Sequence, residues 1–309
     1  MTNPAAKRYP RTILATACIP WDERGMFMEH VFVRQVEMLL DRGIRHIYLF
    51  GTAGEGYGVS ESQFDAVVSA FAQVMRQPGR FPMVGLISLS LPVMLHRIER
   101  AYAMGIRDFM FALPGWGALN DRELLEFLHR LCDPFPDCRF VHYNLMRSNR
   151  LVQPAEYVRL AEEIPNLAGV KFTTDDIRVI HRLLQTEATP LQYFLGEPGF
   201  GYGSLIGECG LLISIAISNL RRAWEFFDAA VRRDAEKVLG FIRELTAMHS
   251  GLMKATVERR MDGAYDKLIF KLVWPEFPLR LLPPYETYSE EQYRRYRAFL
   301  EEHFPEWLE

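Results

Sequence analysis

Short runs rich in β-branched and aromatic residues alternate with amphipathic helical stretches, and this alternation constrains the fold more than any other feature of the sequence. Eight strand–helix units follow one another between residues 13 and 231. No hairpin signal such as Asn-Gly separates them, which favours parallel strands joined by helical crossovers. Closing eight such units gives a (β/α)8 TIM barrel. An open doubly wound sheet is the alternative that the number of units leaves open.

The hydrophobic periodicity places the boundaries of these elements. Ser60 is the expected N-cap of the second helix, Asn120 or Asp121 that of the fourth, and Pro154 opens the fifth. We expect strands at residues 13–19, 46–50, 82–87, 107–113, 139–143, 168–172, 191–195 and 211–217. We expect helices at residues 31–40, 61–75, 93–104, 121–131, 155–163, 175–184, 202–207 and 221–231.

After residue 231 the strand pattern stops and only helical patterns follow. We therefore expect a barrel over residues 1–232 and a helical extension, packed on the barrel, over residues 233–309. The expected helices of the extension cover residues 235–249, 254–261, 266–273 and 290–301.

Composition limits the class of protein. Apolar residues make up 49% of the chain, enough to bury a large core, and the net charge of −3 gives no basic field for nucleic acid or an anionic membrane. No run approaches the roughly 20 apolar residues of a membrane span, and the run 13–19 is short for a signal peptide. With four cysteines and no C-x-x-C pair, the sequence favours a cytoplasmic protein with reduced thiols.

Lysine is scarce. Six of the 36 basic residues are lysine, and Lys171 is the only one between Lys7 and Lys237. Arginine can replace lysine wherever charge alone is needed, but it cannot give up its proton or form an imine. The bias is expected if Lys171 is retained for its nucleophilic amine.

Three expected strand ends carry unusual residues: Gly51-Thr52-Ala53-Gly54-Glu55-Gly56, Tyr143-Asn144 and Gly169-Val170-Lys171. Catalytic groups of such barrels lie where strands end, so we expect Tyr143 and Lys171 within reach of each other. Poor hydration would free the Lys171 amine to form a Schiff base with a carbonyl, and Tyr143 could carry the protons. A solvated rim lysine beside a structural tyrosine is the alternative.

In order and spacing, these motifs resemble the signature of the dihydrodipicolinate synthase/N-acetylneuraminate lyase family, whose members are class I, Schiff-base-forming aldolases and dehydratases of 2-keto acids. The separation of tyrosine and lysine matches (171 − 143 = 28), and the resemblance covers roughly residues 11 to 300. It implies a (β/α)8 fold and pyruvate or another 2-keto acid as substrate, with an aldehyde partner. It also implies no metal or organic cofactor and a homo-oligomer, a tetramer by family resemblance.

The resemblance also implies roles for individual residues. Lys171 would be the Schiff-base lysine, Tyr143 the proton shuttle and Thr52 a hydroxyl relay. The backbone amides of Thr52 and Ala53 would hold the keto-acid carboxylate. The Gly196 carbonyl and Ile213 would line the bound pyruvyl group.

Departures from the family pattern bear on the substrate. Ala53 replaces a second hydroxyl residue, and Gly115-Trp116-Gly117 stands where dihydrodipicolinate synthase has a relay tyrosine. Ser148, a candidate substrate contact, occupies the place of the arginine that grips that enzyme's second substrate, and Arg147 would point elsewhere. Dihydrodipicolinate synthase activity is therefore not expected.

The distal pocket is expected to be apolar or aromatic, which favours an apolar or aromatic aldehyde portion over a polyol. Core packing or a subunit contact is the alternative for these side chains. The expected lining residues are Leu113, Trp116, Met146, Phe172 and Tyr202.

Other signals carry less weight. Neither glycine run, Gly54-x-Gly56-x-Gly58 nor Gly199-x-Gly201-x-Gly203, has the spacing of a dinucleotide site. The histidines form no His-x-His or His-Glu-x-x-His pair, and His142 should face away from Tyr143 because strand neighbours alternate. Glu55 is expected to stabilise its turn as a hydrogen-bond acceptor.

Together these features predict a pyruvate-dependent class I lyase that makes or breaks the carbon–carbon bond of a 2-keto acid. A dehydratase or hydratase using the same Schiff base is one alternative. A ligand-binding pseudoenzyme, inactivated through Ala53 and the missing relay tyrosine, is another.

Overall fold

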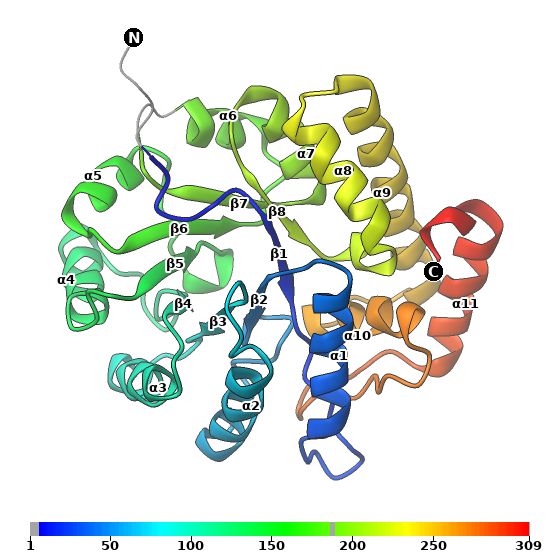
Figure 1. The fold of residues 1–309 in the computed structure, drawn as a ribbon, viewed down its shortest axis with the longest axis horizontal. Helices are drawn as coiled ribbons and strands as arrows, with labels where there is room; N and C mark the ends of the chain where they lie inside the picture. The colour runs from blue at the N-terminus through cyan, green and yellow to red at the C-terminus, as the bar shows by residue number, and fades with distance from the viewer. Residues whose placement is uncertain (1–5, 186–188, 309) are drawn as a thin grey trace.

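The strands close into a barrel. The computed structural model describes residues 6–185 and 189–308, so the outermost ends of the two expected parts, 1–5 and 309, lie outside the described residues. All eight strands pair in parallel and in chain order, and β8 pairs with β1, which confirms the TIM barrel over the doubly wound sheet (Figure 1). The strands are β1 (Ile13–Thr16), β2 (His46–Leu49), β3 (Phe81–Gly85), β4 (Asp108–Phe111), β5 (Arg139–Tyr143), β6 (Leu167–Phe172), β7 (Gln192–Gly196) and β8 (Gly210–Ile213).

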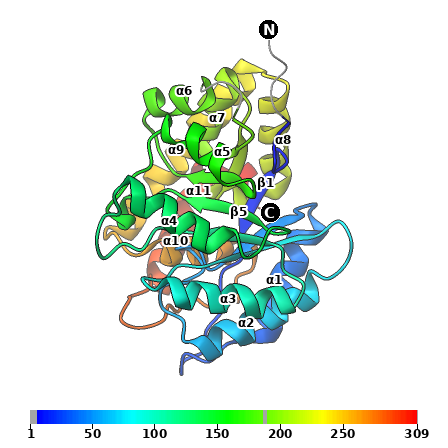
Figure 2. The same ribbon diagram turned by 90° about the vertical axis from the view of Figure 1, so that its left-hand side faces the viewer.

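Helices form the outer layer, in which α1, α2 and α3 lie side by side (Figure 2). The predicted N-caps Ser60 and Asn120 each accept a hydrogen bond from the backbone N–H three residues on, and both complete capping boxes. The barrel helices are α1 (Glu29–Asp41), α2 (Glu61–Val74), α3 (Leu91–Ala103), α4 (Asp121–Cys132), α5 (Glu156–Glu163), α6 (Ile177–Gln185), α7 (Glu197–Ile206) and α8 (Leu220–Val231).

Some boundaries differ from those predicted. β1 ends at Thr16 rather than at residue 19, and the expected strand 211–217 divides into β8 and the 3-10 helix η2 (Ile215–Ser218). In both places the chain stays apolar and buried beyond the last paired residue, so periodicity alone does not locate the end of the ladder. α7 begins at Glu197 rather than at residue 202.

Up to residue 308, the extension contains three α-helices, α9 (Ala235–Thr256), α10 (Asp262–Val273) and α11 (Glu290–His303). The prediction of separate helices at 235–249 and 254–261 is wrong, because α9 runs unbroken to Thr256. Gly251 does not end the helix: a Cβ there would lie 2.0 Å from the ring of Phe299, so glycine lets α11 pack closely on α9. The expected helix 266–273 starts earlier, at Asp262.

The amino-terminal mouth of the barrel is plugged by Tyr9. Its hydroxyl lies 3.0 Å from Nδ1 of His46 and 3.3 Å from Oδ2 of Asp108. Arg139 donates two hydrogen bonds of 2.7 Å to the same carboxylate. Burial, with the nearby Arg139 charge, lowers the pKa of His46 to about 4, so the imidazole is neutral in this cluster. The polar groups that fill this end are thus paired with one another.

The carboxylate of Glu55 fastens the extension to the other mouth. Glu55 is fully buried, and accepts hydrogen bonds from Trp21 Nε1 at 2.9 Å, Lys267 Nζ at 2.5 Å and the Leu282 backbone N–H at 2.6 Å. The expected acceptor role is confirmed, although its partners are distant segments rather than the turn itself. One buried anion therefore joins the β1 loop, the β2 turn, α10 and the segment before α11.

Two further observations bear on the expected compartment. All four cysteines are buried and unpaired. Within residues 6–185 and 189–308, no helix combines the length and the hydropathy that crossing a membrane requires.

Replacing Lys267 by methionine should lower the free energy of unfolding by about 3–5 kcal/mol, because it leaves the Glu55 carboxylate buried without a counter-ion. Chemical denaturation measures this change. The matched control is Lys237→Met, which removes an exposed amine 3.5 Å from Asp234 and should cost at most about 0.5 kcal/mol. Equal effects of the two substitutions would contradict the fastening role of Glu55.

Candidate active site

Lys171 and Tyr143 are brought together by strand register. β5 and β6 pair so that Tyr143 lies directly opposite Lys171. Lys171 is 3% exposed, and its Nζ lies 3.3 Å from the ring centroid of Tyr143 and 5.1 Å from that of Tyr48. The predicted proximity of the two residues is confirmed, and the lysine is buried rather than a solvated rim residue.

Thr52 joins this pair from the β2 turn. Its Oγ1 lies 3.2 Å from the hydroxyl oxygen of Tyr143, and both Thr52 and Ala53 are buried. The turn folds back tightly on its own strand: a Cβ at Gly56 would lie 2.3 Å from the carbonyl oxygen of Phe50. Glycine at this position lets the turn carry Thr52 to the barrel mouth.

Lys171 differs from the other buried lysines in its partners. Lys267 is paired with Glu55, and Lys271 donates to the backbone carbonyls of Pro275 and Phe277. Among the hydrogen bonds and ion pairs of the described residues, none joins the Lys171 amine to an oxygen; its nearest partners are the two aromatic ring faces. The amine is therefore buried without being engaged by a carboxylate.

The predicted pyruvyl-lining residues lie at the ends of β7 and β8. Gly196 is the N-cap of α7, at the rim of the barrel. Leu212 faces the barrel interior, and so the side chain of its neighbour Ile213 packs outward in the layer between strands and helices. The structure therefore places Gly196 at the barrel mouth. Ile213 can contribute only its backbone there, because its side chain points outward.

The predicted apolar wall does not assemble within one chain. Trp116, on the loop after β4, is 90% exposed, and Met146 and Tyr202 are also exposed. Leu113 and Phe172 pack in the core between strands and helices. Core packing, one of the alternatives to a ligand contact, therefore holds for Leu113 and Phe172. The exposed side chains of Trp116, Met146 and Tyr202 are accessible to another protein surface.

Residues 146–148 form the 3-10 helix η1 (Met146–Ser148) after β5. Ser148 is buried, whereas Arg147 is partly exposed and forms an ion pair with Asp262 at the start of α10, with 3.1 Å between the nitrogen and oxygen atoms. Tyr143 is among the groups that raise the pKa of Arg147, so the expectation that Arg147 points elsewhere stays a prediction. Its charge links the β5 loop to the extension.

His142 faces away from Tyr143, as strand alternation predicts. Its Nδ1 lies 2.8 Å from the hydroxyl of Tyr157, and its ring stacks on that of Phe111. Burial lowers the pKa of His142 to about 3, with a smaller contribution from Arg150, so this imidazole is neutral. It belongs to the layer between the barrel and its helices.

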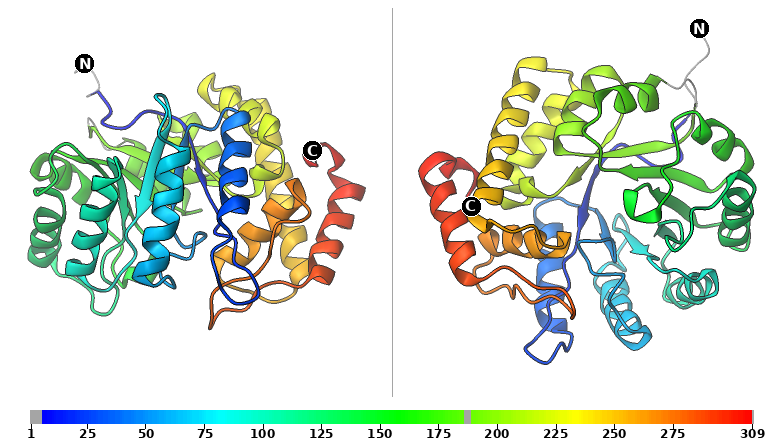
Figure 3. Two further views of the ribbon diagram at one scale, coloured as in Figure 1. Left: turned by 60° about the horizontal axis from the view of Figure 1, so that its bottom comes forward. Right: turned by 180° about the vertical axis from the view of Figure 1, so that it is seen from behind.

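The sequence did not single out Asp266 of α10 as a site residue. Asp266 is 6% exposed, and one of its oxygens, Oδ1, accepts a hydrogen bond from Ser214 Oγ at 3.0 Å. Seen from behind the barrel, α10 lies between α11 and the strands (Figure 3, right). One feature of the sequence could have indicated Asp266. It lies next to Lys267 in the otherwise apolar stretch from Gly263 to Phe270.

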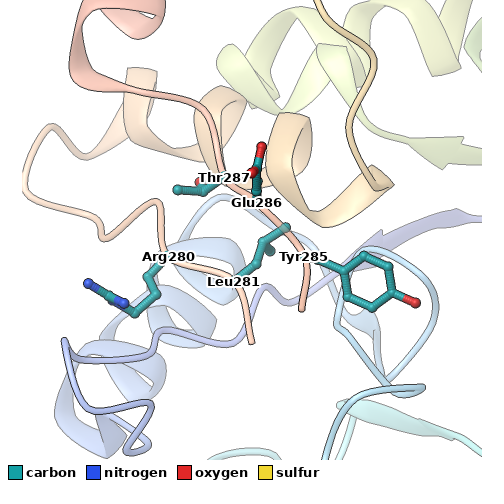
Figure 4. A pocket seen from close by; sticks show the side chains of 5 residues that line it. All are labelled: Arg280, Leu281, Tyr285, Glu286 and Thr287. Carbon is teal, nitrogen blue, oxygen red and sulfur yellow. The ribbon is translucent and has the colours of Figure 1, made fainter. Parts of the chain in front are cut away.

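A hollow of about 500 Å³ lies in the segment before α11 (Figure 4). Arg280 and Tyr285 point in opposite directions from this segment. None of the site residues predicted from the sequence lines the hollow, which is formed by Arg280, Leu281, Tyr285, Glu286 and Thr287.

Comparison with known proteins agrees with this geometry. Residues 9–302 match the profile of the dihydrodipicolinate synthetase family. A 4-hydroxy-tetrahydrodipicolinate synthase of Thermus thermophilus is 26% identical over 176 residues. These cover 56% of this chain and 58% of that enzyme, so the match spans little more than half of the relative's length.

Solved structures share the fold at low identity. A prophage protein of the dihydrodipicolinic acid synthase family from E. coli K12, in complex with pyruvate, matches with a TM-score of 0.85 and 14% identity, over 94% of this chain and 98% of that one. Proteus mirabilis N-acetylneuraminate lyase matches with a TM-score of 0.80 and 17% identity, over 97% and 99%. The family profile matches this chain along most of the chain's length, and the fold agrees with the match. This chain therefore belongs to the dihydrodipicolinate synthetase family.

Proposed function

We propose that this protein is a class I lyase that forms a Schiff base between Lys171 and the ketone of a 2-keto acid. The observation that carries the proposal is the Lys171 amine itself. It is buried, engaged by no carboxylate among the described residues, and seated on the ring of a tyrosine whose hydroxyl meets Thr52. A buried amine in such surroundings is suited to attack a carbonyl.

The reaction follows from these positions. The amine attacks the ketone carbon and water is lost, and the resulting iminium accepts the electron pair of the bond next to it. Breaking that carbon–carbon bond requires removal of a proton from the substrate hydroxyl. The Tyr143 and Thr52 hydroxyls, 3.2 Å apart, form a pair that can take up this proton and pass it on. The backbone amides of Thr52 and Ala53 would hold the carboxylate.

The site residues define the second substrate less closely than they define the 2-keto acid. Ser148 supplies no cation for a second carboxylate, and Arg147 is held by Asp262, so an aldehyde portion without a carboxylate is favoured over aspartate semialdehyde. Loss or addition of water through the same iminium is the alternative reaction. The exposed Trp116 and Met146 favour a contact with another subunit of a homo-oligomer, from which the apolar part of the pocket would be completed.

Incubation with pyruvate followed by borohydride reduction should add a reduced pyruvyl group to Lys171, because borohydride fixes an imine as a stable amine. Mass spectrometry of peptides locates the adduct. Lys171→Ala should abolish it, whereas Lys254→Ala, which removes an exposed lysine of α9, should leave it unchanged. Absence of an adduct in the folded wild-type protein would contradict the Schiff-base proposal.

Substitutions in the hydroxyl pair should slow proton transfer without preventing imine formation. Exchange of the pyruvate methyl protons with deuterated solvent reports on the enamine and needs no second substrate, so nuclear magnetic resonance can follow it. Tyr143→Phe should slow exchange by about 10²-fold or more. Thr52→Val should slow it as well, and Thr52→Ser, which restores the hydroxyl, should recover most of the rate.

Wild-type exchange rates in both Tyr143→Phe and Thr52→Val would exclude the proton relay. Adduct formation and proton exchange without cleavage or dehydration of any 2-keto acid in a broad panel would favour the ligand-binding pseudoenzyme.

A further inference from the structure

Asp266 reaches the end of β8 at the barrel mouth, although it belongs to the extension. Its carboxyl is hydrogen-bonded to Ser214, the residue that follows β8. Where its helix α10 begins, a Cβ at Gly263 would lie 3.0 Å from the carbonyl oxygen of Ala53, so the helix packs directly on the turn that carries Thr52. The ionisable groups that face Asp266 come from four strands or strand ends and from α10 itself. They are Cys18, Tyr48, Lys171, Glu197, Asp262 and Tyr265.

Lys171 is the basic residue of this set, and Asp266 is the acid whose pKa its charge affects. Oδ1 of Asp266 is occupied by Ser214, whereas Oδ2 accepts no hydrogen bond within the described part of the chain. Glu197, the other buried acid nearby, is engaged by the backbone N–H groups of Ser214 and Ala216, at 2.6 and 3.0 Å. Asp266 therefore has a carboxyl oxygen available for chemistry, and Glu197 is committed to the backbone.

Tyr143 is placed differently. The Lys171 nitrogen lies over the face of the Tyr143 ring, and the phenol oxygen at the ring's edge meets Thr52. The phenol oxygen is thus already engaged by Thr52, which leaves room for a second proton-transfer residue next to the nitrogen. We propose that Asp266, supplied by the extension, is this second proton-transfer residue and donates the proton that departs with water when Lys171 forms its Schiff base.

The step balances in atoms and charge. After the amine has added to the ketone, its proton moves to the former carbonyl oxygen and gives a neutral carbinolamine. The carbon–oxygen bond then breaks while the nitrogen lone pair forms the carbon–nitrogen double bond, and the leaving hydroxyl takes the proton of Asp266. The products are one water molecule, the iminium cation and the Asp266 carboxylate, which face each other in the same mouth. Hydrolysis of the final iminium returns the proton.

The surroundings of Asp266 suit a proton donor. Burial raises the pKa of Asp266 well above its ordinary value, and the charges of Asp262 and Glu197 act in the same direction. The Ser214 hydrogen bond and the Lys171 charge oppose them. The carboxyl therefore keeps its proton at a pH at which an exposed aspartate has lost it, and it becomes ionised when the iminium cation forms beside it.

The inference rests on the proposed Schiff base, and the rate of borohydride-trapped adduct formation with pyruvate tests it across about pH 5 to about pH 9. In the wild-type protein, the rate should fall as the pH rises through the pKa of Asp266. The isosteric Asp266→Asn substitution should slow trapping by about 10²-fold, remove that falling limb and leave the adduct reached after long incubation unchanged. Asp228→Asn, the same substitution at an exposed site of α8, should behave as wild type.

Ser214→Ala keeps the acid and changes only its hydrogen bond. Because that bond lowers the pKa of Asp266, its loss should move the falling limb to higher pH. Trapping by Asp266→Asn at the wild-type rate, or a slower rate with an unchanged pH profile, would overturn the proton-donor role. Failure of the wild-type protein to trap pyruvate at all would instead overturn the proposed function.

Discussion

The buried carboxylate of Glu55 is the contact on which the geometry of the barrel mouth depends. It sits in the turn that presents Thr52, and its partners come from the β1 loop, from α10 and from the segment before α11. A carboxylate without exposed surface is stable only if its charge and its lone pairs are matched, so these four segments are held in one arrangement. That arrangement positions the hydroxyl of Thr52, in the turn that carries Glu55, and the carboxyl of Asp266, next to Lys267 in α10.

The three buried lysines show how environment separates structural from chemical roles. Lys267 and Lys271 donate hydrogen bonds to oxygen acceptors and tie helices and loops together. Lys171 sits on aromatic faces, and its charge lowers the pKa of the Asp266 carboxyl. The buried lysines therefore have two kinds of role: two hold segments of the fold together, and the third supplies the amine of the proposed reaction.

The sequence predicted the barrel because eight strands and their crossover helices leave a regular period in hydrophobicity. It also predicted that Tyr143 meets Lys171, since register between neighbouring parallel strands places equivalent ends side by side. The position of α10 could not be predicted in this way, because no period relates the extension to the barrel. Asp266 was expected at the first turn of a helix, where an acid is ordinary, whereas the helix begins four residues earlier (266 − 262) and buries it. Nor could periodicity show that Trp116 projects outward, because loop direction is set by tertiary contacts.

A crystal structure of the protein soaked with pyruvate tests the central claim most directly. The account predicts continuous electron density from Nζ of Lys171 to the C2 carbon of the ligand. The ligand carboxylate should face the backbone amides of Thr52 and Ala53, and the Asp266 carboxyl should lie on the side of the new carbon–nitrogen bond. Pyruvate held without a covalent bond, or attached to another lysine while Lys171 stays free, would contradict it.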